Sequence, residues 1–145
     1  MRITAEHVDT AHLLAVKNHR GQKYGKEDYY GYHLCGVLDR YKSMYPNYAP
    51  YEEVAVILHD IVEDTEVEMD FIFKTFGDKV GSIVDSMTKK RGESYGMYIR
   101  RLSRNPSAVK VKRADASFNL QESIKEDLVD NISKYKEVLS TLESI

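Results

Sequence analysis

Helical periodicity is the feature that most limits how this chain of 145 residues can fold. Apolar residues recur every three or four positions, few stretches alternate with period two, and only three prolines interrupt the pattern. We therefore predict an all-α protein, a bundle of about seven to eight helices in one domain spanning residues 1–145. A loop is expected over Gly21–Tyr29. The helices are expected to begin near Ala5, Tyr30, Tyr51, Met69, Val80, Tyr95, Pro106 and Leu128, with Gly77 closing the one from Met69.

Charge and composition exclude several classes of partner. The formal net charge of −2 provides no general field for holding nucleic acid or an anionic membrane, so a phosphate group must be bound locally. The longest aliphatic run, Val54–Leu58, is far shorter than the roughly 20 residues of a membrane-spanning helix, and the first residues do not resemble a signal peptide. We expect a cytoplasmic protein. The single cysteine, Cys35, excludes an internal disulfide and a multi-cysteine zinc site, so any metal would depend on histidines and carboxylates.

The helix expected from about Tyr51 to Asp64 or Thr65 carries a cluster of polar residues. At 100° per residue, His59, Asp60, Glu63 and Asp64 fall on one face, opposite the apolar residues. Such a face is ordinarily just solvated. However, three acids within about two turns repel one another unless a cation lies nearby. A divalent metal would relieve that repulsion, because histidine nitrogen and aspartate oxygen are suitable ligands for Mn, Fe or Zn ions.

A second carboxylate stands out in the helix that Pro106 begins. Asp115 interrupts a stripe formed by Ala108, Val111 and Phe118, so it is expected to be buried. Burying an unpaired carboxylate costs several kcal/mol, so Asp115 needs a partner. A metal ion would serve, and so would an ion pair with Arg113 or with a distant lysine. The residue alone does not decide between these.

Several motifs together resemble a known family. Residues 55–65 read AVILHDIVEDT, which is similar to the His-Asp signature and the following Glu-Asp pair of the RelA/SpoT-type hydrolases and their small relatives. Further segments resemble family motifs in the same order along the chain, namely HRGQ at 19–22, YGYH at 30–33, FGDKV at 76–80, TK at 88–89 and KRADASFNL at 112–120. The resemblance therefore extends over roughly His19 to Leu120.

The resemblance implies an HD-type fold and a set of functional residues. It implies one metal ion, usually Mn²⁺ in this family, held by His33, His59, Asp60 and Asp115. Glu63 and Asp64 match the pair that positions the attacking water and handles its proton, and Asn119 matches a residue near the nucleoside. The candidate substrate-binding residues are Tyr24, Lys23, Lys112 and Asn119.

The chain also departs from the family pattern. Tyr24 stands where relatives usually carry an arginine that packs on guanine, and Gln121-Glu122 replaces the usual Arg-Thr. A tyrosine can stack on a base but adds no cation. The residues expected to hold the metal and the water are thus present, while those expected to recognise the substrate are altered.

The resemblance implies a Mn²⁺-dependent enzyme that removes the 3′-pyrophosphate of ppGpp, guanosine 3′,5′-bis(diphosphate), or of a related nucleotide, to give GDP and pyrophosphate. A small-molecule nucleotide is the expected partner. One alternative is an HD hydrolase acting on another phosphorylated nucleotide, which Tyr24 and Gln121 favour. Another is a catalytically silent HD-fold module that binds a nucleotide or a protein. The Glu63-Asp64 pair argues against the silent module, because a purely structural domain has no evident use for so many clustered acids.

Overall fold

The computed structural model describes residues 1–145 as eight α-helices, one π-helix and a small β-hairpin, so the all-α prediction is confirmed. The α-helices are α1 (Ala5–Asn18), α2 (Cys35–Met44), α3 (Pro50–Leu58), α4 (Ile61–Asp64), α5 (Met69–Met87), α6 (Tyr95–Leu102), α7 (Pro106–Lys125) and α8 (Val129–Glu143). The π-helix is η1 (Tyr29–Leu34), and the hairpin strands are β1 (Lys23–Tyr24) and β2 (Glu27–Asp28). None of the helices has the length and apolar character needed to span a membrane.

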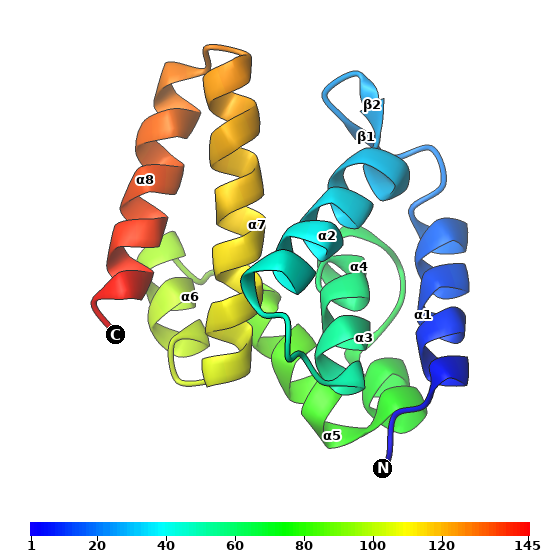
Figure 1. Ribbon diagram of the computed structural model, residues 1–145. Coiled ribbons are helices and arrows are strands. Elements are labelled where there is room, and N and C mark those ends of the chain that lie inside the picture. The colour runs from blue at the N-terminus through cyan, green and yellow to red at the C-terminus, as the bar shows by residue number, and fades with distance from the viewer.

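The helices surround α3, which contacts α1, α2, α5 and α7. In Figure 1, α7 and α8 form an antiparallel pair on one side, α1 lies on the other, and α5 runs across the bottom. Residues 54–58 of α3 are all fully buried within a core of 29 apolar residues. A helix that is apolar on every side belongs in the centre of a bundle. The residues that follow the end of α3 therefore begin in the interior of the molecule.

Local sequence signals fix several helix boundaries as expected. Pro50 opens α3, one residue before the expected start at Tyr51, and its missing N–H costs nothing there. The side chain of Asn105 accepts hydrogen bonds from the backbone N–H groups of Ser107 and Ala108, which caps α7. Gly77 has a φ of 87° and interrupts the helical conformation inside α5, so the two helices expected on either side of it are joined by a kink.

The expectation that the helix after Pro50 runs on to Asp64 is wrong. Helix α3 ends at Leu58, His59 and Asp60 form a turn, and α4 begins at Ile61. The His59 side chain donates from Nδ1 to the Val56 carbonyl at 2.6 Å, which takes an acceptor away from the helical pattern. His59 is consequently fully buried, whereas Glu63 and Asp64 are exposed. The polar residues do not share one helix face.

The expected loop over Gly21–Tyr29 contains the β-hairpin. Lys23 pairs with Asp28 and Tyr24 with Glu27, and Gly25 adopts a φ of 59° in the turn. The Asp28 carboxylate then accepts a hydrogen bond from the Gly31 N–H at 2.9 Å and caps η1. The helix expected from Tyr30 to Met44 thus begins one residue earlier and opens as a π-helix, a form often found at functional sites.

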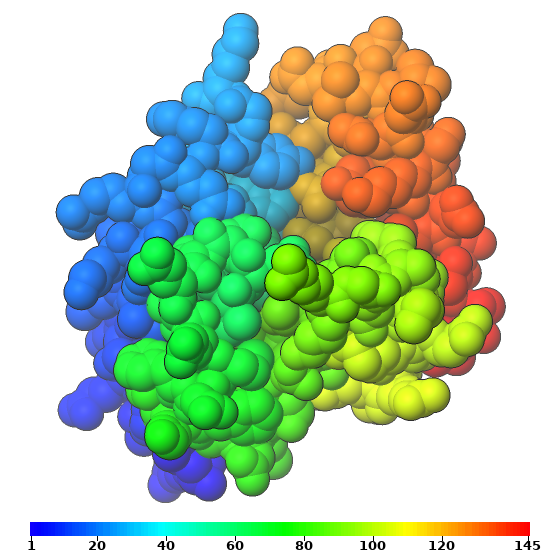
Figure 2. Space-filling model, turned by 180° about the vertical axis from the view of Figure 1, so that it is seen from behind, coloured from blue at the N-terminus to red at the C-terminus, as the bar shows by residue number.

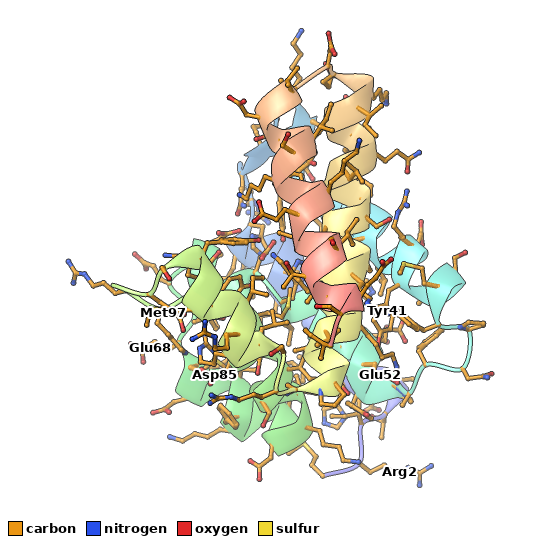
Figure 3. All side chains as sticks on the ribbon, turned by 90° about the vertical axis from the view of Figure 1, so that its left-hand side faces the viewer. Arg2, Tyr41, Glu52, Glu68, Asp85 and Met97 are labelled. Atoms are coloured by element: carbon orange, nitrogen blue, oxygen red, sulfur yellow. The ribbon has the colours of Figure 1, made fainter.

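A buried polar network joins α2, α3 and α7 beside the core. Tyr41 of α2 donates to the Glu52 carboxylate of α3 at 2.6 Å, and the two side chains lie close together in Figure 3. Lys110 of α7 forms an ion pair with the same carboxylate. Glu52 also accepts from the Ala49 N–H at 2.7 Å, so the buried carboxylate is fully supported.

The packing of α2 against α7 predicts an effect on stability. Gly36 of α2 lies against the Phe118 ring of α7, and a Cβ at position 36 would overlap that ring. We expect Gly36→Ala to lower the free energy of unfolding by about 1–3 kcal/mol, the usual cost of overpacking. Gly96→Ala is the matched control, because no atom lies within 4 Å of its new Cβ. It should be neutral or stabilising by up to about 1 kcal/mol. Urea unfolding of both variants measures the difference, and equal stabilities would contradict the packing.

Candidate functional site

The turn after α3 presents a buried imidazole with one unused nitrogen. Because a carbonyl oxygen only accepts, the 2.6 Å bond to Val56 places a proton on His59 Nδ1. His59 Nε2 then carries a lone pair in the neutral ring, and this fully buried atom has no hydrogen-bond partner. A histidine that donates from one nitrogen to a backbone carbonyl and leaves the other bare has the arrangement of a metal ligand.

Other ligand atoms gather around that nitrogen. His59 Nε2 lies 3.2 Å from Asp60 Oδ2, and one ligand atom each from His33, His59 and Asp60 lie within 4.8 Å of one another. Asp115 approaches from α7, with Oδ1 3.3 Å from His33 Nε2 and 3.7 Å from His59 Nε2. The structure thus brings together all four residues for which a metal was expected. Two nitrogens and two carboxylates form a donor set suited to a divalent transition metal.

The carboxylates of this cluster favour a positive charge between them. Burial on its own would raise the pKa of both carboxyl groups, but His59 lowers that of Asp60 to about 2, and Lys112 with the imidazoles lowers that of Asp115 well below its usual range. Burial would lower the pKa of His59, yet Asp60 and Asp115 outweigh it and raise this pKa well above its ordinary value. Both carboxylates therefore stay ionised. Their negative charge can be balanced by a proton on His59 or, in its place, by a divalent cation.

Lys112 and Asn119 support Asp115 from the same helix. Lys112 Nζ lies 3.4 Å from Asp115 Oδ2, and Asn119 Nδ2 lies 3.4 Å from Asp115 Oδ1. The ion pair with Arg113, one of the partners considered for Asp115, is not formed, because Arg113 instead donates to the Leu142 carbonyl. Lys112 is itself buried, with its ammonium over the rings of Tyr95 and Tyr98.

Glu63 and Asp64 lie on α4, immediately after the turn. Glu63 accepts a hydrogen bond from the Lys89 backbone N–H at 2.8 Å, and Asp64 accepts one from Gln22 Nε2 at 3.0 Å. Partial burial raises the pKa of both carboxyl groups, and the charge of Asp60 adds to the effect. A raised pKa makes a carboxylate a better proton acceptor near neutral pH.

A hollow of about 290 Å³ opens on this cluster. Its wall includes His33, Asp60, Asp115 and Glu63. Figure 2 shows the face on which the hairpin region (blue), the segment from α4 to α6 (green) and the α7–α8 pair (orange) meet around a recess. Asp64 does not line the hollow and connects to its wall through Gln22. The lining cations are Lys23, Lys89, Lys112 and Lys134. The lining tyrosines are Tyr24, Tyr29, Tyr95, Tyr98 and Tyr135. Lysines beside carboxylates suit an anion that arrives together with a metal cation.

Tyr24 separates this hollow from a second one of about 550 Å³, and Tyr24 and Tyr135 line both. The Tyr24 ring stacks on His33 with centroids 4.4 Å apart and an interplanar angle of 19°. Its hydroxyl donates to Asn119 Oδ1 at 2.7 Å. The candidate substrate residues Tyr24, Lys23, Lys112 and Asn119 thus all lie on or beside the wall of the site.

Some site residues escaped the sequence analysis. Tyr29 donates from its hydroxyl to Asp60 Oδ2 at 2.7 Å, and only its position next to the YGYH segment could have pointed to it. Lys134 and Tyr135 lie on α8, beyond the region covered by the motifs. No local sequence motif marks these two residues, because it is the packing of α8 on α7 that brings them to the hollow.

Comparisons with known proteins agree with the motifs. A GTP pyrophosphokinase of Streptomyces antibioticus is 29% identical over 127 residues, covering 81% of this chain and 15% of that protein. A guanosine-3′,5′-bis(diphosphate) 3′-pyrophosphohydrolase of Aquifex aeolicus is 25% identical over 125 residues, covering 81% of this chain and 18% of that protein. The chain therefore spans less than a fifth of these curated relatives. No family model matches it.

A solved structure gives the fold. It is described as a metazoan ortholog of SpoT that hydrolyses ppGpp and plays a role in starvation responses. It superposes with a TM-score of 0.79 at 19% identity, covering 98% of this chain and 88% of that one. The resemblance of this chain to the hydrolase domain of RelA/SpoT-type proteins and to the small metazoan SpoT homologue is therefore confirmed.

Proposed function

We propose that this protein hydrolyses the 3′-pyrophosphate of ppGpp or a related nucleotide, giving GDP and pyrophosphate, with one divalent metal ion, Mn²⁺, held by His33, His59, Asp60 and Asp115. The observation that carries the proposal is the bare, buried Nε2 of His59, which lies beside two ionised carboxylates that themselves line a hollow rich in lysine. A bound divalent ion would lower the pKa of a water molecule and offset charge on the pyrophosphate. The similarity to proteins named for ppGpp synthesis and hydrolysis supports this choice of substrate.

The residues around the cluster would carry out the proton transfer, bind the phosphates and position the ligands. Glu63, on the wall, and Asp64, next to it, orient the attacking water and take up its proton on their carboxylate oxygens, for which their raised pKa values suit them. As the water oxygen bonds to phosphorus and the bond from phosphorus to the ribose 3′-oxygen breaks, the proton returns to that 3′-oxygen, which leaves as the hydroxyl of GDP. Lys23, Lys89 and Lys134 provide cations for the phosphate oxygens. Tyr29 holds Asp60 in place through its hydroxyl.

A second candidate substrate is a different phosphorylated nucleotide. Tyr24 and Glu122 both line the second hollow, so an aromatic ring and a carboxylate lie where a nucleoside would extend from the site. This wall differs from the arginine-based one of the family that the motifs resemble, while the four residues proposed to hold the metal match those motifs. The catalytically silent alternative is the weaker one, because a module that only binds has no use for two carboxylates of raised pKa beside the cluster.

The metal assignment predicts a binding stoichiometry. Purified protein should bind about one Mn²⁺ per chain, and His59→Gln should lose it, because the ion needs the bare Nε2. His12→Gln is the matched control, since His12 bonds to the Tyr30 hydroxyl at 2.8 Å and does not line the hollow. Elemental analysis, together with the rise in melting temperature on adding Mn²⁺, measures binding without reference to activity. Parental metal content in a folded His59→Gln variant would contradict the assignment.

The proposed roles of the two acids on α4 predict a loss of turnover without a loss of metal. Glu63→Gln and Asp64→Asn keep the side-chain shapes and remove the proton acceptor, so kcat on ppGpp should fall by about 10²–10⁴-fold. Metal content should stay near that of the parent. Turnover and metal content are to be measured on the same samples. Near-parental turnover in both variants would refute the role, and joint loss of metal and turnover would make these residues ligands instead.

The position of Tyr24 predicts a contribution to nucleotide binding. Stacking of a base on its ring would use the face turned away from His33, so Tyr24→Ala should weaken nucleotide binding by about 1–3 kcal/mol. Tyr24→Phe keeps the ring, loses the bond to Asn119, and should bind nearly as well as the parent. Dissociation constants for ppGpp in the Glu63→Gln background would report this. Parental affinity in Tyr24→Ala would show that the base binds elsewhere.

A further inference from the structure

A buried histidine at the end of α1 has no part in the mechanism described so far. His19 is 1% exposed, and its Nδ1 lies 2.7 Å from Oε1 of Gln22. The backbone also closes this segment, because the Gln22 N–H donates to the His19 carbonyl at 2.9 Å and Gly21 adopts a φ of 84°. A short turn, closed at a glycine that can adopt a positive φ, thus holds the Gln22 side chain against the imidazole.

The direction of each hydrogen bond follows from Asp64. Its ionised carboxylate can only accept, so the amide nitrogen of Gln22 must face it, and the Nε2 to Oδ2 distance is 3.0 Å. The amide oxygen then faces His19, which requires a proton on His19 Nδ1. His19 Nε2, on the other side of the ring, is buried and has no hydrogen-bond partner. If the amide turned over, its oxygen would face the carboxylate and repel it.

The same imidazole supports a second residue of the cluster. The rings of His19 and Tyr29 pack with centroids 4.4 Å apart, and the Tyr29 hydroxyl donates to Asp60 Oδ2 at 2.7 Å. One side chain of α1 therefore supports Asp64 through Gln22 and Asp60 through Tyr29. Contacts of this kind around a metal site commonly change activity by about 10–100-fold when they are removed.

We propose that His19 and Gln22 form a positioning relay: His19 fixes the orientation of the Gln22 amide, and Gln22 holds the Asp64 carboxylate beside the metal cluster. This inference rests on the proposed hydrolysis and deepens it. Neither residue is assigned a contact with the reacting atoms. Gln22 lines the hollow and Asp64 does not, so the amide is the link between the wall of the site and the acid.

The relay predicts a loss of turnover with little change in substrate binding. Gln22→Met keeps the length and removes both hydrogen bonds, so kcat on ppGpp should fall by about 10–100-fold while KM and metal content stay near the parental values. His19→Leu should act in the same way. His19→Asn should keep most of the activity, because an asparagine amide nitrogen can occupy the place of the imidazole Nδ1. His19→Leu combined with Gln22→Met should be no worse than Gln22→Met alone.

The controls separate a relay from general damage. His12→Leu, on the same helix and also at a hydrogen-bonded histidine, should leave kcat unchanged. If His19→Leu does not fold, Gln22→Met in the exterior loop still tests the inference. Parental kcat in Gln22→Met, or equal activity of His19→Leu and His19→Asn, would overturn the relay while leaving the proposed hydrolysis intact.

A spectroscopic measurement tests the relay without turnover. In protein with ¹⁵N-labelled histidine, His19 should carry a proton on Nδ1, and Gln22→Met should change the Nδ1 shift. An Nδ1 without a proton would overturn the relay whatever the activity. A parent that binds metal and fails to hydrolyse ppGpp would instead refute the proposed function, and the catalytic part of the relay with it.

Discussion

The hydrogen bond from His59 Nδ1 to the Val56 carbonyl, at 2.6 Å, connects the fold to the site. It forms at the end of a helix whose last five residues are apolar and fully buried, so the imidazole lies inside the core rather than on the surface. It also ends α3 there and turns the chain, which places Asp60 next to the ring and sends α4 outward with Glu63 and Asp64. A single local bond thereby separates a buried His-Asp cluster, proposed to hold the metal, from the two acids proposed to handle the proton.

Once His59 is fixed, the remaining elements supply what a buried, charged cluster needs. The π-helix η1 brings His33, and α7 brings Asp115 with Lys112 and Asn119 beside it. Two ionised carboxylates in a core are unfavourable without cations. Lys112 and the imidazoles meet part of that demand, and a divalent ion would meet the rest. The lysines that line the hollow would attract an anionic substrate to the same place.

Sequence patterns predicted helix boundaries well where a residue determines the conformation of the backbone next to it. Pro50, Gly77 and Asn105 mark their boundaries through local geometry, which a sequence shows directly. The break at His59 was not predictable from periodicity, because it depends on a side chain competing for the Val56 carbonyl. The four residues of the cluster could be named from family motifs, since ligands need defined residue types. Lys134 and Tyr135 could not, because only the packing of α8 brings them to the hollow, and the link from Gln22 to Asp64 spans 42 residues of sequence.

The central claim is that this chain cleaves the 3′-pyrophosphate of ppGpp at a metal site formed by His33, His59, Asp60 and Asp115. The most direct measurement is to incubate metal-stripped protein with ppGpp, with and without Mn²⁺, and to identify the products by chromatography. We expect GDP and pyrophosphate in equal amounts with Mn²⁺, and unchanged ppGpp without it. Full turnover by the stripped protein, or intact ppGpp in the presence of protein shown to carry Mn²⁺, would contradict the account.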